Sequence, residues 1–138
     1  MNKFAFINIP SQELERPPAA AALLQSVIKS IGWDCKVFDF NIFLNNEVDN
    51  ETWSELESYW RCKIESISTL ATKKLHTIFE KFTKQLQAYD PDWIGISVFS
   101  RFSTVPCHEL VKYLRPRMRS KIMRSKILQI YKIISYKL

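Results

Sequence analysis

The sequence predicts an α/β protein in which helices cover a parallel β-sheet. Short apolar runs at 3–9, 35–41 and 93–99 are typical of buried strands. Helical patterns separate these runs. A helix that joins two strands of one sheet makes them parallel and gives a right-handed crossover. The chain has 138 residues, 46% of them hydrophobic, which is enough for one domain with a single core.

The first strand–helix–strand unit fills about the first 40 residues. The run at 3–9 is almost wholly apolar and ends before a proline, as a buried strand does. Two prolines open an alanine- and leucine-rich segment, which predicts a helix over 18–31. Gly32 is expected to end that helix with a positive φ, and the second strand follows at 35–41.

The segment after the second strand is helical. Apolar residues recur there every three or four positions, which is the period of an amphipathic helix. One helix over the whole stretch 52–88 would span roughly 55 Å, too long for a compact domain. The hydroxyl-rich stretch 66–72 is therefore expected to contain a break between helices over 52–66 and 72–89. Thr52 and Glu55 form a capping-box pattern at the start.

The third strand is expected to be central. The run at 93–99 is apolar on both faces, as a strand covered on both sides must be. Thr104 is expected to cap a helix over 105–115, with Pro106 in its first turn. Residues 120–123 begin like a fourth strand.

These elements predict a Rossmann-like sheet in the flavodoxin-like order 2-1-3-4. The sheet is incomplete in its C-terminal half and carries a helical insertion at about 50–89 between strands 2 and 3. Helices that follow strands 1 and 3 go to opposite faces, so a ligand crevice opens at the carboxyl ends of those strands. The loops at 10–16 and 100–104 would line it.

Composition and charge exclude several classes of protein. The net charge is +6, yet residues 111–138 hold nine basic and no acidic side chains. With two glycines and no GxGxxG or GxxxxGK motif, a phosphate-cradling loop is not expected. The three cysteines read as reduced thiols. Neither a membrane span nor a signal peptide is expected, so we predict a cytoplasmic protein.

Three segments in this order resemble a known domain. They are Arg16-Pro17-Pro18 opening the first helix, Lys36-Val37-Phe38-Asp39 in the second strand, and residues 91–100 around the third. The set resembles the N-terminal cobalamin-binding domain of cobalamin-dependent radical SAM enzymes, over residues 3 to about 123. The resemblance implies a Rossmann-like module that binds cobalamin (vitamin B12) at the carboxyl ends of its strands. Its parent enzyme would be a methyltransferase or maturase, with a separate radical SAM subunit as partner.

The resemblance also implies roles for individual residues. Ser97 aligns with a serine that contacts the nucleotide tail of cobalamin, and its alternative role is a buried serine bonded to its own backbone. Arg16 and Arg101 would meet an anion such as the cobalamin phosphate, or else be solvated or paired. The expected cofactor-binding residues are Pro10, Ser11, Arg16, Ser97, Ser100, Arg101, Ser103 and Thr104. Ser100, Ser103 and Thr104 would contact corrin amides or cap a helix.

Two departures from that family limit what the chain can do. The loop after strand 1 lacks the Asp-x-His-x-x-Gly motif, so cobalt would have no histidine ligand from it. The Gly-Gly turn after strand 4 and the CxxxCxxC motif for an iron–sulfur cluster are also missing. The chain is therefore not expected to be a complete enzyme alone. His76 and His108 are expected to be surface or capping residues.

Residues 124–138 form a basic tail outside the family pattern. The near-duplicate segments 119–123 and 124–128 suggest a local duplication or a frameshift. An apolar stripe within 123–138 is expected to cover the open edge of strand 3 or 4. Two other functions stay open: a small basic α/β protein whose tail binds nucleic acid or an anionic membrane, and a non-functional truncated product. Of these partners, nucleic acid is not favoured.

Overall fold

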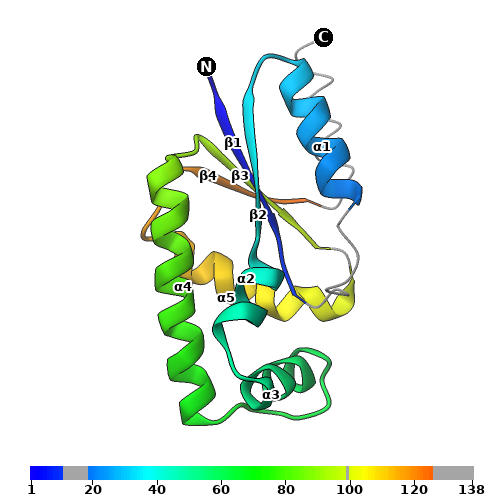
Figure 1. Cartoon of the computed structure of the whole chain (residues 1–138), viewed down its shortest axis with the longest axis vertical. Helices are drawn as coiled ribbons and strands as arrows, with labels where there is room; N and C mark the ends of the chain where they lie inside the picture. The colour runs from blue at the N-terminus through cyan, green and yellow to red at the C-terminus, as the bar shows by residue number, and fades with distance from the viewer. Residues whose placement is uncertain (11–18, 99, 126–138) are drawn as a thin grey trace.

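The computed structural model describes residues 1–10, 19–98 and 100–125, and it contains a four-stranded parallel sheet (Figure 1). The strands are β1 (Lys3–Asn8), β2 (Asp34–Asp39), β3 (Trp93–Ser97) and β4 (Lys121–Ser125). Their order is β2-β1-β3-β4, and every neighbouring pair is parallel. The predicted α/β class, the order 2-1-3-4 and the central place of the third strand are confirmed.

Helices cover both faces of the sheet. The helix α1 (Ala19–Ser30) packs on one face, where the side chains of Phe4 and Phe6 lie. The opposite face is covered by α2 (Phe40–Glu47), α4 (Thr69–Tyr89) and α5 (Thr104–Leu114). Figure 1 shows α1 and α4 on opposite sides of the strands, with α3 (Asn50–Trp60) beyond the end of the sheet.

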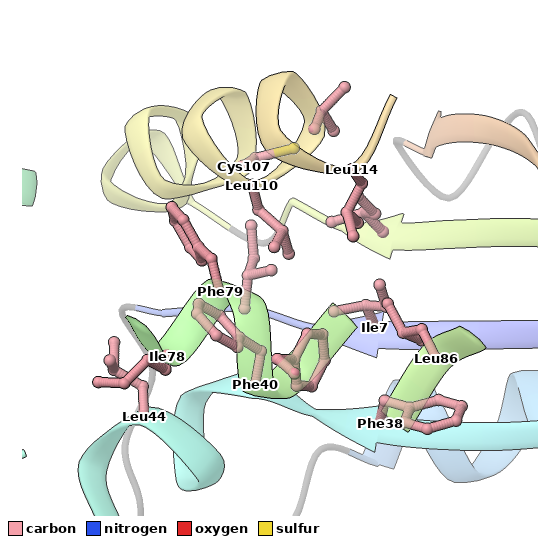
Figure 2. Close-up of a cluster of buried hydrophobic side chains, with 14 of the residues drawn as sticks. Ile7, Phe38, Phe40, Leu44, Ile78, Phe79, Leu86, Cys107, Leu110 and Leu114 are labelled. Carbon is pink, nitrogen blue, oxygen red and sulfur yellow. The ribbon is translucent and has the colours of Figure 1, made fainter. Parts of the chain in front are cut away.

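The larger hydrophobic core lies between the sheet and α2, α4 and α5. Ala5, Ile7 and Ile9 of the first strand and its extension enter it from the sheet, and all three are fully buried. Figure 2 shows Phe38, Phe40, Phe79 and other side chains of this core meeting between the strands and the helices. Burying one such side chain contributes about 1.5–3 kcal/mol, so this layer fixes α4 and α5 against the sheet.

The chain leaves β2 earlier than predicted. Residues 40 and 41 were expected to extend the strand, but the helix α2 begins at Phe40. Asp39 is its N-cap, because Asp39 Oδ1 accepts a hydrogen bond of 2.9 Å from the backbone N–H of Ile42. An aspartate in this place satisfies a backbone donor that would otherwise be unpaired, and so favours a helix start over further strand.

The capping box predicted from Thr52 and Glu55 is wrong. Asp49 caps α3, accepting 2.9 Å hydrogen bonds from both the backbone N–H and the hydroxyl of Thr52. The Glu55 carboxylate instead accepts from the backbone N–H and hydroxyl of Ser68. Ser68 in turn caps α4, so Glu55 ties the end of the α3–α4 connection to α3.

A break between these helices is present, but it spans 61–68 and only overlaps the predicted stretch 66–72: α3 ends at Trp60 and not at residue 66, and α4 begins at Thr69 and not at residue 72. The α1 helix ends as predicted, since Gly32 follows it with φ +80°. The cap predicted at Thr104 is wrong: Ser103 holds the N-cap position of α5, and Thr104 is the first helical residue. A 3₁₀ turn, η1 (Arg101–Ser103), leads directly into α5, which leaves no separate capping position for Thr104.

The fourth strand runs to Ser125, two residues beyond the boundary expected for the domain. The apolar stripe and the basic tail expected from the sequence lie outside the described residues from 126 onward. Within the described ranges, no helix combines the length and the apolar composition needed to cross a membrane.

Candidate ligand-binding site at the carboxyl ends of the strands

The two central strands send their helices to opposite faces. After β1 the chain continues to α1 on one face, and after β3 it continues to α5 on the other. These strands are direct neighbours, with Asn8 opposite Ser97 at their last residues. Such a reversal leaves a crevice at the carboxyl ends, which is where open α/β sheets bind ligands. The switch point predicted from the element order is therefore present, and the ligand crevice beside it stays a prediction.

Polar residues occupy the last position of every strand. Asp39 lies opposite Asn8, Asn8 opposite Ser97, and Ser97 opposite Ser125. Because side chains alternate along a strand, Asn8 shares the face of Phe6 two residues before it, which is the α1 face. The same alternation puts Asp39 and Ser97 on that face. A polar row therefore crosses the carboxyl edge of the sheet.

The amide of Asn8 is held in one orientation. Asn8 is 2% exposed, and its Nδ2 donates a 3.0 Å hydrogen bond to Asp39 Oδ2. The carboxylate of Asp39 can only accept, so the nitrogen of the amide must face it and Oδ1 must face away. Among the described residues Oδ1 has no hydrogen-bond partner. A buried acceptor with a fixed direction and no described partner therefore lies beside the switch point.

The connection between β3 and α5 adds two buried hydroxyls. Ser100 Oγ and Ser103 Oγ are inaccessible to solvent and find no partner within the described part of the chain. Neither side chain caps the helix that follows it, so the capping role left open for both is not observed. Ser103 is fully buried at the start of α5. These hydroxyls, Asn8 Oδ1 and Asn41 Oδ1 at the start of α2 are buried oxygens near the carboxyl ends of the strands that form no hydrogen bond with the described residues.

The other predicted residues of this region differ in position. Arg101 and Thr104 are exposed. The Arg101 guanidinium lies 4.8 Å from the centre of the Phe102 ring, as in a cation–π contact. Ser97 is partly exposed at the end of β3, so its predicted deep burial is not found. Pro10 is buried just after β1.

The remaining predicted residues, Ser11 and Arg16, lie outside the described residues. Whether they reach the crevice stays a prediction.

The Phe4 ring covers Gly95 on the α1 face of the sheet. A Cβ atom on Gly95 would lie 2.7 Å from Phe4 Cζ, so the Phe4 ring already fills the space over that glycine. Gly95 is two residues before Ser97 on the same face of the sheet. A ligand on the α1 face therefore meets the level of Asn8 and Ser97 and cannot reach further along β3 toward Trp93.

Asn8 and Asp39 are the site residues that the sequence reasoning missed. Asn8 reads as an interruption of an apolar run, and Asp39 as a residue inside a strand. The sequence does contain a signal for both residues. Each is a polar residue at the last position of its strand, and side-chain alternation puts each on the same face as the apolar residue two positions before it.

Other chemistry-bearing residues do not converge on this site. His76 and His108 are exposed on α4 and α5, as expected. Among the described residues, no three His, Cys, Asp or Glu side chains gather closely enough to hold a metal ion. Burial raises the pKa of the Cys35 thiol to about 11, which keeps it protonated at neutral pH.

Comparison of the chain with protein-family models, with curated proteins and with solved structures gave no significant match.

Proposed function

We propose that this chain is a cobalamin-binding module without catalysis of its own. The observation that carries the proposal is a set of three buried side-chain oxygens near the carboxyl ends of β1 and β3 that find no partner among the described residues: Asn8 Oδ1, Ser100 Oγ and Ser103 Oγ. Leaving such a group unsatisfied costs about 1–3 kcal/mol, so a ligand that supplies hydrogen bonds there is favoured. The corrin ring of cobalamin is edged with amide side chains, which both donate and accept.

The proposed roles follow from position. Asn8 Oδ1 accepts from an amide N–H, and the hydroxyls of Ser100 and Ser103 bond to further amides. Ser97 contacts the nucleotide tail, and Arg101 attracts its phosphate. Bound cobalamin supplies a cobalt–carbon bond for methyl transfer or radical chemistry. This chain's residues bind and orient it, and the loop at 10–16 contains no histidine to ligate cobalt.

We expect the binding to be weak. Phe4 closes the space over Gly95, so only the outer part of the α1 face is open to the nucleotide tail. The Gly-Gly turn that would lie under this tail in the family is also absent from the sequence.

Retention of hydroxocobalamin tests the proposal. The protein is mixed with an excess of hydroxocobalamin and desalted, and the corrin absorbance that stays with it is measured. We expect retention by the unmodified chain and its loss in Ser97→Leu, because a leucine fills the space beside Asn8. Ser54→Leu, on an exposed position of α3, is the matched control and should retain as much as the unmodified chain. No retention by the unmodified chain refutes the function, and full retention by Ser97→Leu refutes the placement.

A second variant separates ligand contact from structural damage. Ser103 is fully buried and its hydroxyl has no described partner, so Ser103→Ala removes an unsatisfied polar group. The free energy of unfolding without ligand should stay equal or rise slightly, by up to about 1 kcal/mol. Retention of cobalamin should fall all the same. A fall in both quantities would mean that the hydroxyl serves the fold and not the ligand.

A further inference from the structure

A second cavity lies on the helical side of the molecule. It is a cleft of about 550 Å³ between the α3–α4 connection, α4 and α5. Its lining includes Tyr59, His76, Phe79, Glu109, Lys112 and Tyr113. This cleft adjoins the core on the face opposite to Asn8 and Ser97, so it is separate from the crevice described above.

One wall of the cleft is aromatic. The ring centres of Phe79 and Tyr113 are 5.3 Å apart, and the His76 ring lies 6.0 Å from Tyr113. Figure 2 shows Phe79 rising from α4 toward α5, and Phe79 is the buried member of this wall. Rings at these separations offer faces and edges on which a further flat ring can pack.

Glu109 places a carboxylate on the inner side of the cleft. It accepts a 3.3 Å hydrogen bond from Trp60 Nε1 and a second one from the Tyr59 hydroxyl. Burial is the main cause that raises the pKa of this carboxyl above its ordinary value. Within the described ranges no ion pair of Glu109 with a lysine or arginine is seen, and the His76 imidazole is the titratable group whose charge lowers the pKa of this carboxyl. A carboxylate has about four acceptor sites, so two protein donors leave room for a cationic group.

The mouth of the cleft has the opposite charge. Lys112 lies about one turn beyond Glu109 on α5 and is exposed. Arg117 adds a second cation, although its guanidinium is held 3.8 Å from the Tyr113 ring centre and donates to the Tyr113 carbonyl. Glu65, an exposed acid of the α3–α4 connection, also lines the cleft. A ligand thus meets cations first and a carboxylate further in.

We infer that this cleft binds a small aromatic zwitterion, with its ammonium group at Glu109, its anionic group at Lys112 and its ring on the wall of Phe79, His76 and Tyr113. A ligand with only a positive charge is repelled at the mouth, and one with only a negative charge meets the inner carboxylate. The aromatic wall favours a ligand with a ring. This inference does not depend on the cobalamin proposal, since the two sites share no residue.

Three probes that share one ring test the charge pattern. L-phenylalanine carries both charges, phenethylamine only the ammonium group and 3-phenylpropanoate only the carboxylate. Each is titrated into the full chain, and backbone amide shifts in NMR spectra report both the affinity and the place of binding. We expect L-phenylalanine to bind about two- to fivefold more tightly than phenethylamine, as an exposed ion pair allows. The shifts should centre on 109–113 and 75–79.

Two variants assign the charges. Lys112→Met should reduce the affinity for L-phenylalanine and raise the affinity for phenethylamine, because the same cation attracts the carboxylate of one probe and repels the ammonium group of the other. Glu109→Gln should weaken both ligands by about tenfold, because a charged hydrogen bond is lost. Lys73→Gln on α4 and Glu51→Gln on α3 lie outside the cleft and should change neither affinity.

Several results would overturn the inference. The first is the absence of amide shifts in the cleft when L-phenylalanine is added. The second is an affinity for phenethylamine or 3-phenylpropanoate that equals the affinity for L-phenylalanine. The third is an equal effect of Lys112→Met on the affinities for L-phenylalanine and phenethylamine. If Glu109→Gln does not fold, the Lys112→Met comparison still decides, since that residue is exposed and the comparison is between two probes on one protein.

Discussion

Replacing Gly95 by alanine tests how tightly the α1 face of the sheet is packed. The new Cβ atom would lie 2.7 Å from Phe4 Cζ and 3.0 Å from Phe4 Cε1. Ordinary contacts of this kind begin near 3.4 Å, so the ring would have to retreat by about 0.7 Å. Phe4 is 2% exposed and packs with Phe6, Ala21 and Ile28 in the smaller core, which gives its ring little free space.

Two opposing effects set the size of the change. Overpacking a tight core costs about 1–3 kcal/mol. Alanine in place of glycine also restricts the unfolded chain, which stabilises the protein by about 0.4–1 kcal/mol. We therefore expect Gly95→Ala to lower the free energy of unfolding by roughly 1–2 kcal/mol.

Urea denaturation of four proteins measures this change: the unmodified chain, Gly95→Ala, Phe4→Leu and the double variant. Leucine lacks the ring atoms that meet the new Cβ, so the double variant should be more stable than the sum of the single changes predicts, by about 1 kcal/mol. Additive effects, or a Gly95→Ala protein as stable as the unmodified chain, would refute the proposed contact with Phe4.

Three further predictions concern charge and reactivity. Asn8→Asp puts a second carboxyl about 3.0 Å from the Asp39 carboxylate, so one of the two carboxyls must keep a proton in the folded protein. The folded variant therefore binds more protons than the unfolded variant, and its loss in unfolding free energy, about 2–4 kcal/mol at neutral pH, should be smaller at pH 5. Equal losses at the two pH values would contradict the contact. The exposed Cys62 should react rapidly with a thiol reagent at pH 8, while the buried Cys35, with a pKa raised to about 11, should react only on unfolding; two equally fast thiols would contradict its burial. The raised pKa of Glu109 means that its charged form destabilises the folded state. The unfolding free energy of the unmodified chain, relative to that of Glu109→Gln, should therefore fall as the pH rises above 4.5. A rise would mean that burial does not raise the pKa of this carboxyl.

The sequence was sufficient to predict the sheet and its switch point. The three apolar runs are long enough, and the helical patterns between them clear enough, that only a parallel sheet accommodates both. With the strand order β2-β1-β3, right-handed crossovers put α1 on one face of the sheet and the helices between β2 and β3 on the other. Gly32 marks the end of α1 because few other residues adopt its φ of +80°.

The details of the helix starts could not be predicted, because they depend on competition between nearby groups. Asp39 and Thr52 both fit local patterns, but which side chain caps a helix depends on tertiary contacts. The carboxylate of Glu55 binds Ser68 across the α3–α4 connection, thirteen residues away, and so is not available to a capping box.

The candidate site was predicted in part for a similar reason. Ser97, Ser100 and Ser103 follow from the end of β3, since the loop after a central strand borders the crevice. Asn8 could not be predicted as a site residue from β1 alone. Its role depends on the register between β1 and β2, which places Asn8 opposite Asp39, and the sequence does not specify that register. The orientation of its amide is then a property of the pair and not of either residue.

The central place of β1 also has a consequence for how the chain is made. One edge of β1 can pair with β2 as soon as residue 39 leaves the ribosome, because α1 is the one element described between these strands. Its other edge waits for β3, which is complete only at Ser97, after α2, α3 and α4 have been synthesised. During that interval an apolar strand with open hydrogen-bonding groups is exposed, and such edges readily pair with other chains. The nascent protein is therefore most vulnerable to aggregation between residues 39 and 97, and a chaperone that binds extended apolar segments would act at that stage.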